Sequence, residues 1–140
     1  MSIRVLIVDD EPEICSSLAR RYRLKGYEVD TACGGSEALE QLETRPYQVV
    51  VSDISMPGID GIELLRMIKR DYPMTQVIMM TGYVTLENGL ACLRHGAYTC
   101  IFKPLEDLTE LDGAIEALIA HLQHWERKLL QLKGLGEGKQ

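Results

Sequence analysis

Short apolar, β-branched runs alternate with amphipathic segments along most of the chain. The first run, residues 3–8, is IRVLIV, and a segment with helical spacing of apolar residues follows it. The runs cover residues 3–8, 27–32, 47–53, 75–82 and 98–102, and the helical segments cover residues 13–26, 36–43, 61–73, 86–96 and 107 onward. Continuous apolar runs are typical of parallel strands covered on both faces. The alternation predicts a doubly wound α/β fold, with a five-stranded parallel sheet and five helices.

Polar side chains stand where the predicted strands end. Sheets of this class bind ligands at the carboxyl ends of their strands, and the flavodoxin-like strand order 2-1-3-4-5 makes the first and third strands neighbours. The first strand ends at Asp9 and Asp10, and the third ends at Asp53. The fourth and fifth strands end at Thr81 and Lys103. We expect these side chains to share one pocket.

Three successive acids, Asp9, Asp10 and Glu11, stand where the first helix should begin. One acid would be enough to cap a helix and complement its dipole. Two carboxylates about 4 Å apart repel by roughly 1 to 4 kcal/mol, at effective dielectric constants of about 80 to 20. A hard divalent cation relieves this repulsion, and a set of oxygen ligands suits Mg²⁺. Lys103 and Thr81 could then hold phosphoryl oxygens while one carboxylate acts as nucleophile.

Composition and charge exclude several other classes of function. The net charge of −6 argues against direct nucleic-acid binding by this chain, because such affinity comes mainly from clustered Lys and Arg. No apolar run approaches the roughly 20 residues that span a bilayer, and no signal-peptide pattern opens the chain. Four widely spaced cysteines favour buried free thiols over disulfides or zinc ligands. We expect a cytoplasmic protein with no membrane partner.

Four stretches, in order along the chain, carry a resemblance to a known family. VLIVDDEP, VVVSDISMPGIDGIELL, VIMMTGY and GAYTCIFKP resemble the receiver domain of bacterial two-component response regulators, over about residues 3–120. The resemblance implies a receiver domain at 1–120 and a helical extension with a flexible tail at 121–140. It implies a phosphorylation-dependent signalling switch that takes a phosphoryl group from a sensor histidine kinase or a phosphotransfer protein, and controls a partner or an output domain. Such a chain is a switch rather than an enzyme, although it would catalyse its own phosphorylation and slow dephosphorylation.

The resemblance also implies which residues act on the phosphoryl group. Asp53 would be the phosphorylation site, and Thr81 and Lys103 would bind the phosphoryl oxygens. Tyr83, two residues beyond Thr81, is expected to overhang the phosphoryl group and restrict the hydrolytic water. Family members typically have a cis peptide bond before the Pro that follows this Lys, which here is Pro104, and an X–Pro bond tolerates the cis form.

The implied metal site is a Mg²⁺ site at the ends of the first and third strands. Asp10, Asp53 and the backbone carbonyl of Ser55 would ligate the ion, and Asp9 would contribute through a water molecule. The turn after the third strand matches the family pattern at Pro57, Gly58 and Gly61.

The switch region departs from the family pattern at one position. An aromatic residue commonly stands three residues before the phosphoryl-binding Lys and swings inward when the Thr moves, and this chain has Cys100 there. The usual relay from Thr81 to an aromatic ring therefore needs another residue. Tyr98 or Phe102 could supply the missing ring.

Apolar residues recur at alternating steps of three and four along the final helical segment. They are Leu108, Leu111, Ile115, Leu118, Leu122, Trp125, Leu129 and Leu132. This is the a/d pattern of a coiled-coil seam, although its first half could simply pack against the sheet. The pattern predicts an extended C-terminal helix that makes a parallel homodimer contact or a signalling stalk, with folding back on its own domain as the alternative. Gly134, Gly136 and Gly138 should end the helix and leave a flexible tail.

Three rival functions fit parts of the same pattern. A phosphatase of the haloacid dehalogenase type needs D-x-D just after its first strand, and neither VDDEP nor SDISMP has that spacing. A flavodoxin-like cofactor binder needs a phosphate loop after the first strand, where three acids would repel the phosphate. A receiver-like scaffold that works by association and rarely cycles phosphate stays open.

Overall fold

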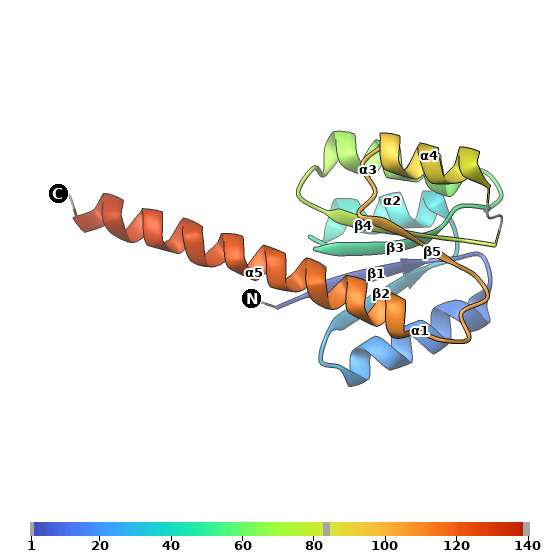
Figure 1. Ribbon diagram of the computed structural model, residues 1–140, viewed down its shortest axis with the longest axis horizontal. Coiled ribbons are helices and arrows are strands. Elements are labelled where there is room, and N and C mark those ends of the chain that lie inside the picture. The colour runs from blue at the N-terminus through green and yellow to red at the C-terminus, as the bar shows by residue number, and fades with distance from the viewer. Residues whose placement is uncertain (1, 83–84, 139–140) are drawn as a thin grey trace.

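Five parallel strands form one sheet in the order β2-β1-β3-β4-β5, which confirms the predicted fold (Figure 1). The structure is a computed structural model that describes residues 2–82 and 85–138, with the side chains of 136–138 excepted. The strands are β1 (Arg4–Val8), β2 (Glu28–Ala32), β3 (Val49–Asp53), β4 (Gln76–Thr81) and β5 (Thr99–Phe102). Each strand begins one or two residues later than the sequence predicts. β3 lies at the centre of the sheet and is buried at all of its positions.

Helices cover both faces of the sheet (Figure 1). They are α1 (Pro12–Leu24), α2 (Gly35–Thr44), α3 (Gly61–Asp71), α4 (Leu86–Arg94) and α5 (Thr109–Gly138). Val5 and Ile7 of β1 pack in the core beneath α1 and α5, whereas Leu6 and Val8 pack in the core beneath α2, α3 and α4. This alternation follows from the two-residue period of a strand. Because apolar side chains fill both faces of the central strands, polar side chains that meet solvent there lie at the strand ends.

The first half of α5 is held against α1 by one carboxylate. Asp112 accepts hydrogen bonds from Arg21 Nε and from the buried Tyr22 hydroxyl, both at 2.9 Å. The hydrogen bond from Arg21 lowers the pKa of Asp112 most strongly, against the effect of burial. Leu111 and Ile115 are fully buried beside this contact. The helix therefore leaves the domain in a direction fixed by its first three turns.

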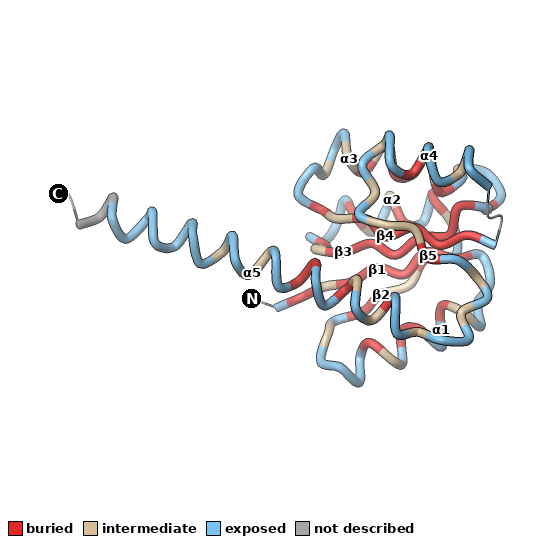
Figure 2. Tube along the Cα trace, in the orientation of Figure 1, coloured by how far each residue is buried: buried red, intermediate tan, exposed pale blue. Residues whose placement is uncertain are grey.

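The second half of α5 projects beyond the sheet and the other helices (Figures 1 and 2). Trp125, Leu129 and Leu132 on this half are 54–62% exposed. We expected glycines to end the helix, and α5 continues past Gly134 before it ends at Gly138. The predicted flexible tail is therefore wrong as far as Gly138, and residues 139–140 lie outside the described chain. At 1.5 Å per residue, the part after residue 121 is roughly 25 Å long.

The cysteines are all free, as predicted, but not all of them are buried. Cys15 and Cys92 are buried, Cys100 is partly buried and Cys33 is exposed. Cys33 follows β2 at the surface, where its thiol lies 2.7 Å from Glu37 Oε2. Its exposure corrects the expectation of buried thiols at this position. Within residues 2–82 and 85–138, the helices are too short or too polar to cross a membrane.

Candidate functional site

Three carboxylates meet at the carboxyl ends of β1 and β3. Asp9 and Asp10 follow β1 and Asp53 ends β3, and one oxygen of each lies within 4.8 Å of the others. The pairing of Val8 with Ser52 in the parallel ladder brings the two strand ends side by side. Asp9 and Asp53 are buried, whereas Asp10 is exposed. An oxygen-only donor set that is partly open to solvent fits Mg²⁺, which usually keeps several water ligands.

Lys103 reaches into this cluster from the end of β5. Its Nζ lies 2.9 Å from Asp9 Oδ2, 3.3 Å from Asp53 Oδ2 and 3.5 Å from Glu11 Oε1. Burial alone would lower the pKa of Lys103, but the hydrogen bond to Asp9 and the nearby negative charges outweigh it and raise the pKa. The ammonium therefore stays charged. Because one cation faces several carboxylates, the site retains a negative charge that a divalent ion would neutralise.

Asp53 is less easily ionised than an ordinary aspartate. Burial raises its pKa, the positive charge of Lys103 opposes that shift, and the carboxylate of Asp9 adds to it. A hydrogen bond from the backbone of Ser55 stabilises the charged form. A bound cation would favour the carboxylate further. The ionisation of Asp53 and the binding of a cation at this cluster are thus coupled through charge.

The turn after β3 fixes the backbone of Asp53. Gly61 N–H donates a hydrogen bond of 2.8 Å to the carbonyl of Ile54. A Cβ at Gly61 would lie 2.0 Å from the carbonyl oxygen of Asp53, so a larger residue cannot fit without moving the backbone. Gly58 has φ of +75°, a conformation that L-residues rarely adopt. Ser55 lies exposed in the same turn, and its expected role as a carbonyl ligand stays a prediction.

Thr81 and Lys103 are placed side by side by the ladder between β4 and β5. The N–H of Lys103 donates to the carbonyl of Thr81 at 2.8 Å, and the Thr81 side chain is buried. The Lys103–Pro104 peptide bond is cis. The structure therefore brings together Asp9, Asp10, Asp53, Thr81 and Lys103 at one edge of the sheet. Tyr83 lies outside the described residues, so its expected position over the site stays a prediction.

The switch positions Tyr98, just before β5, and Cys100 and Phe102, on β5, alternate along the chain but differ in burial. Cys100 is partly buried and packs against the core beneath α4, close to the thiol of Cys92. Burial raises the pKa of Cys100 to about 12, so it stays a neutral thiol. Tyr98 is 47% exposed and Phe102 is 56% exposed. A thiol, rather than an aromatic ring, fills the interior position between these two surface rings.

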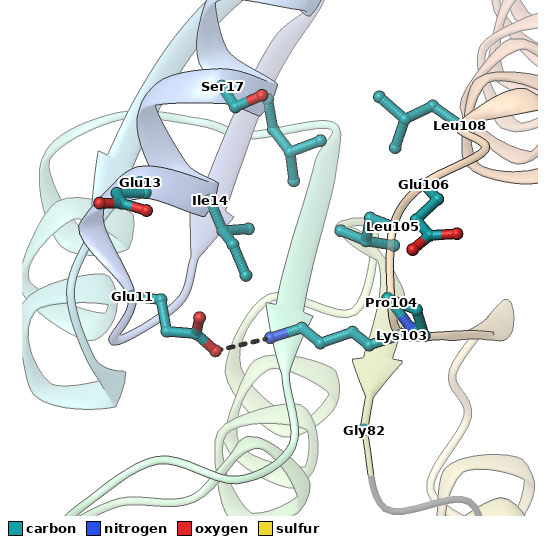
Figure 3. Close-up of a pocket in the computed structure, with 11 residues that line it drawn as sticks. Glu11, Glu13, Ile14, Ser17, Gly82, Lys103, Pro104, Leu105, Glu106 and Leu108 are labelled. Carbon is teal, nitrogen blue, oxygen red and sulfur yellow. Dashed lines mark ion pairs between the residues drawn. The ribbon is translucent and has the colours of Figure 1, made fainter.

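A groove adjoins the acidic cluster, and sequence reasoning did not predict it. It lies between α1 and the segment that joins β5 to α5, and has a volume of about 580 Å³ (Figure 3). Ile14, Leu18, Leu105 and Leu108 supply its apolar lining, and Glu11, Glu13 and Glu106 supply acidic groups. Lys103 also lines the groove, which therefore leads to the acidic cluster. The run of acids at residues 9–11 pointed to the cluster but not to the ion pair between Glu11 and Lys103 (Figure 3).

Comparison with known proteins agrees with the fold. Residues 5–116 match the model of the response regulator receiver domain family. The chain is 37% identical to the transcriptional regulatory protein ZraR of Escherichia coli O157:H7 over 86% of its own length and 27% of that protein. It is 36% identical to the DNA-binding transcriptional regulator NtrC of Escherichia coli K12 over 93% of its own length and 28% of that protein.

Solved receiver structures are similar along most of the chain. A CheY-like receiver domain protein from Methanospirillum hungatei superimposes with a TM-score of 0.81 and 33% identity, covering 89% of this chain and 99% of that one. The response regulator TrrA of Thermotoga maritima, solved in complex with Mg²⁺ and BeF, gives a TM-score of 0.74 and 34% identity over 83% of this chain and 98% of that one.

The fold and the acidic site thus define a phosphoacceptor class of signalling domain. The chain belongs to the response regulator receiver domain family. It acts as a signalling switch in two-component regulation and spans little more than a quarter of the length of ZraR and NtrC.

Proposed function

We propose that Asp53 accepts a phosphoryl group from the phosphohistidine of a sensor kinase or phosphotransfer protein. The observation that carries this proposal is the contact of Lys103 with both Asp53 and Asp9, at 3.3 and 2.9 Å, inside a cluster of three strand-end carboxylates. Folding alone does not account for three carboxylates around one lysine, because each buried charge costs desolvation free energy. A site that holds a metal ion and a phosphoryl group together explains the arrangement.

The transfer itself requires one nucleophile and fixed charges. A carboxylate oxygen of Asp53 attacks the phosphorus, and a P–O bond forms as the P–N bond to the imidazole breaks. The imidazole nitrogen keeps the electron pair and is released after it takes a proton. Lys103 neutralises charge on the phosphoryl oxygens, and the Thr81 hydroxyl donates a hydrogen bond to one of them. The chain would thus promote its own phosphorylation, and slow attack of water on the acyl phosphate would release inorganic phosphate and restore the Asp53 carboxylate.

Asp10, Asp53 and the carbonyl of Ser55 are the residues that would hold Mg²⁺, with Asp9 acting through water. When bound, the ion would neutralise charge on the phosphoryl group and on the carboxylates. The fit rests on the oxygen-only donors and on the exposed position of Asp10. The Mg²⁺ and BeF bound to TrrA support the same chemistry here.

The groove beside Lys103 is the surface that we propose meets the phosphodonor. Its apolar lining, which includes Ile14 and Leu105, fits the apolar face of a partner helix. Glu11 and Glu13 favour basic residues beside that face of the partner. A partner helix there would lie beside the phosphoryl-binding residues. We place this exchange in the cytoplasm, since the four cysteines are free.

A homodimer through α5 is also proposed, because exposed Trp125, Leu129 and Leu132 would otherwise face water on the projecting helix. Light scattering of the whole chain tests it. A dimer at micromolar concentration is expected, and a strictly monomeric chain, with or without beryllofluoride, would exclude it.

Phosphorylation by a small donor tests the central proposal. With acetyl phosphate and Mg²⁺, intact mass should rise by one phosphoryl group, and Asp53→Asn should abolish the increment. Glu40→Gln, an exposed carboxylate on α2, is the control and should behave as wild type. A wild-type chain that gained no phosphoryl group would favour the rival function of an association scaffold.

A further inference from the structure

The apolar stripe on the projecting half of α5 lies on the side of the helix that packs against the chain's own sheet. Ile115, Leu122 and Leu129 are spaced by seven residues, and a straight helix drifts only about 20° over each such interval. Ile115 is fully buried in the domain, whereas Leu129 is 57% exposed. Leu118 and Trp125 are also seven residues apart, and Leu118 is 1% exposed whereas Trp125 is 54% exposed. The stripe therefore points toward the space directly beyond the domain.

That space is bounded by a second groove, at the edge formed by the amino ends of the strands. Residues 42–48 and 72–75 line it together with Leu122, and its volume is about 560 Å³. Tyr72, Pro73 and Met74 supply apolar surface, and Met74 is 77% exposed. Because Leu122 belongs to both, the apolar part of this basal groove continues the stripe, and Glu43, Arg45 and Gln48 line the rest of the groove.

This placement conflicts with a parallel pair of helices. In a parallel two-fold pair the stripes would face each other, and both domains would have to occupy the space between the same two helices. An antiparallel pair avoids the conflict, since each domain then lies at the opposite end. We propose that two copies of this chain associate through antiparallel α5 helices, with the helix end of each copy seated against the basal groove of the other. The inference rests on the proposed dimer and is independent of phosphorylation at Asp53.

The register follows from keeping the seam positions in contact. Leu122 then packs against Leu132 of the second copy, and Trp125 packs against Leu129 of the second copy. Two-fold symmetry repeats each contact, which closes the assembly as a dimer rather than a fibre. The two grooves lie at the two ends of the paired helices.

The area that a stable dimer needs explains why the groove takes part. The projecting stripe covers only about two heptads, fewer than the three or four that sustain a coiled coil. Specific interfaces bury roughly 1,200 to 2,000 Å². Contact with Tyr72 and Met74 at each end enlarges the short seam on both copies. Met74 itself is otherwise an apolar side chain left in water.

Cross-linking of a mixed sample tests the direction of the helices. Leu122→Cys and Leu132→Cys are made in a chain with Cys33→Ser, and a short bis-maleimide reagent is added to each variant alone and to their mixture. We expect the mixture to give at least fivefold more covalent dimer than either variant alone, and the Cys33→Ser chain to give none. Efficient cross-linking of Leu122→Cys alone would show a parallel pair and overturn the proposal. A chain that is monomeric by light scattering would overturn it as well.

Contact with the groove is tested separately through Trp125, the only tryptophan in the chain. Its emission should shift to longer wavelength on dilution as the dimer dissociates. Met74→Asp should raise the dissociation constant at least tenfold, whereas Leu24→Asp, at an equally exposed site on α1, should leave it unchanged. Equal dissociation constants for Met74→Asp and wild type would remove the groove from the interface. Phosphorylation by acetyl phosphate should be unaffected in both variants, which separates this inference from the phosphoacceptor proposal.

Discussion

Lys103 Nζ lies 3.3 Å from a carboxylate oxygen of Asp53, although fifty positions separate the two residues in the sequence. The ends of β3 and β5 bring them together, and the same ammonium contacts Asp9. A positive charge already beside Asp53 would need little rearrangement to meet a phosphoryl group there. The strand order of the fold therefore places the ammonium where the proposed phosphoryl transfer needs a positive charge.

Replacement of Lys103 should slow phosphorylation without unfolding the domain. Lys103→Met keeps the apolar stem but leaves the buried carboxylates without their cation. We expect the rate of phosphorylation by acetyl phosphate to fall at least tenfold, which corresponds to about 1.4 kcal/mol. Intact mass measured over time gives the rate. Lys128→Met, on the exposed part of α5, is the matched control, and an equal rate in the two variants would contradict the role of Lys103.

Asp53 should make the stability of the metal-free domain depend on pH. Its pKa is higher in the folded chain than in the unfolded chain, because burial disfavours the carboxylate. Between these two pKa values the folded state binds more protons, so the free energy of unfolding falls as pH rises through that window. Asp53→Asn should therefore be more stable than wild type at pH 7, by about 1 kcal/mol, the lower end of a carboxylate repulsion.

Urea unfolding at two pH values measures this effect. The advantage of Asp53→Asn should shrink below about pH 4, the ordinary aspartate pKa, where the acid is neutral in both states. An advantage that is the same at both pH values would show that the ionisation of Asp53 is not its cause.

Gly61 should tolerate no side chain. The Cβ of Gly61→Ala would lie 2.0 Å from the Asp53 carbonyl oxygen, so the turn after β3 must move. We expect destabilisation of about 1–3 kcal/mol, as for other overpacked sites, with slower phosphorylation. Gly113→Ala is the control, since a Cβ there meets nothing within 4 Å, and helix propensity should stabilise it by roughly 0.5–1 kcal/mol. Urea unfolding compares the two, and equal stabilities would refute the steric argument.

The conformational relay from Thr81 should use an exposed aromatic ring, because Cys100 replaces the usual interior one. Cys100 fills too little volume for a swinging ring, and Tyr98 and Phe102 stand exposed on either side of it. If one of them is the relay, its replacement by Ala should reduce the chemical-shift changes on α4 that beryllofluoride causes, while the changes near Asp53 persist. NMR spectra of Tyr98→Ala and Phe102→Ala decide between them, and a wild-type pattern in both would exclude either ring.

The sequence predicts most of the sheet and the convergence of the site for one shared reason. Buried parallel strands are short apolar runs, and in this topology their carboxyl ends meet, so the pattern of runs is enough to place Asp9, Asp53 and Lys103 together. The ion pair of Glu11 with Lys103 could not be predicted, because it depends on the path of one exposed side chain. The contact of Gly61 with the Asp53 backbone depends on the detailed turn geometry.

The direction of the α5 stripe does not follow from the sequence. The heptad pattern from Leu108 to Leu132 is the same whether the stripe faces the chain's own domain, a parallel partner or an antiparallel one. Only the burial of Leu111, Ile115 and Leu118 shows which side of the helix the domain occupies. Periodicity gives the face of a helix, and tertiary packing decides what covers it.

A two-dimensional NMR titration with beryllofluoride and Mg²⁺ tests the phosphoacceptor site most directly. The amide signals of Asp53, Thr81 and Lys103 should shift only when both components are present, and these shifts should disappear in Asp53→Asn. Spectra that do not change when both are added, or that change equally in Asp53→Asn, would contradict the proposed phosphoacceptor site.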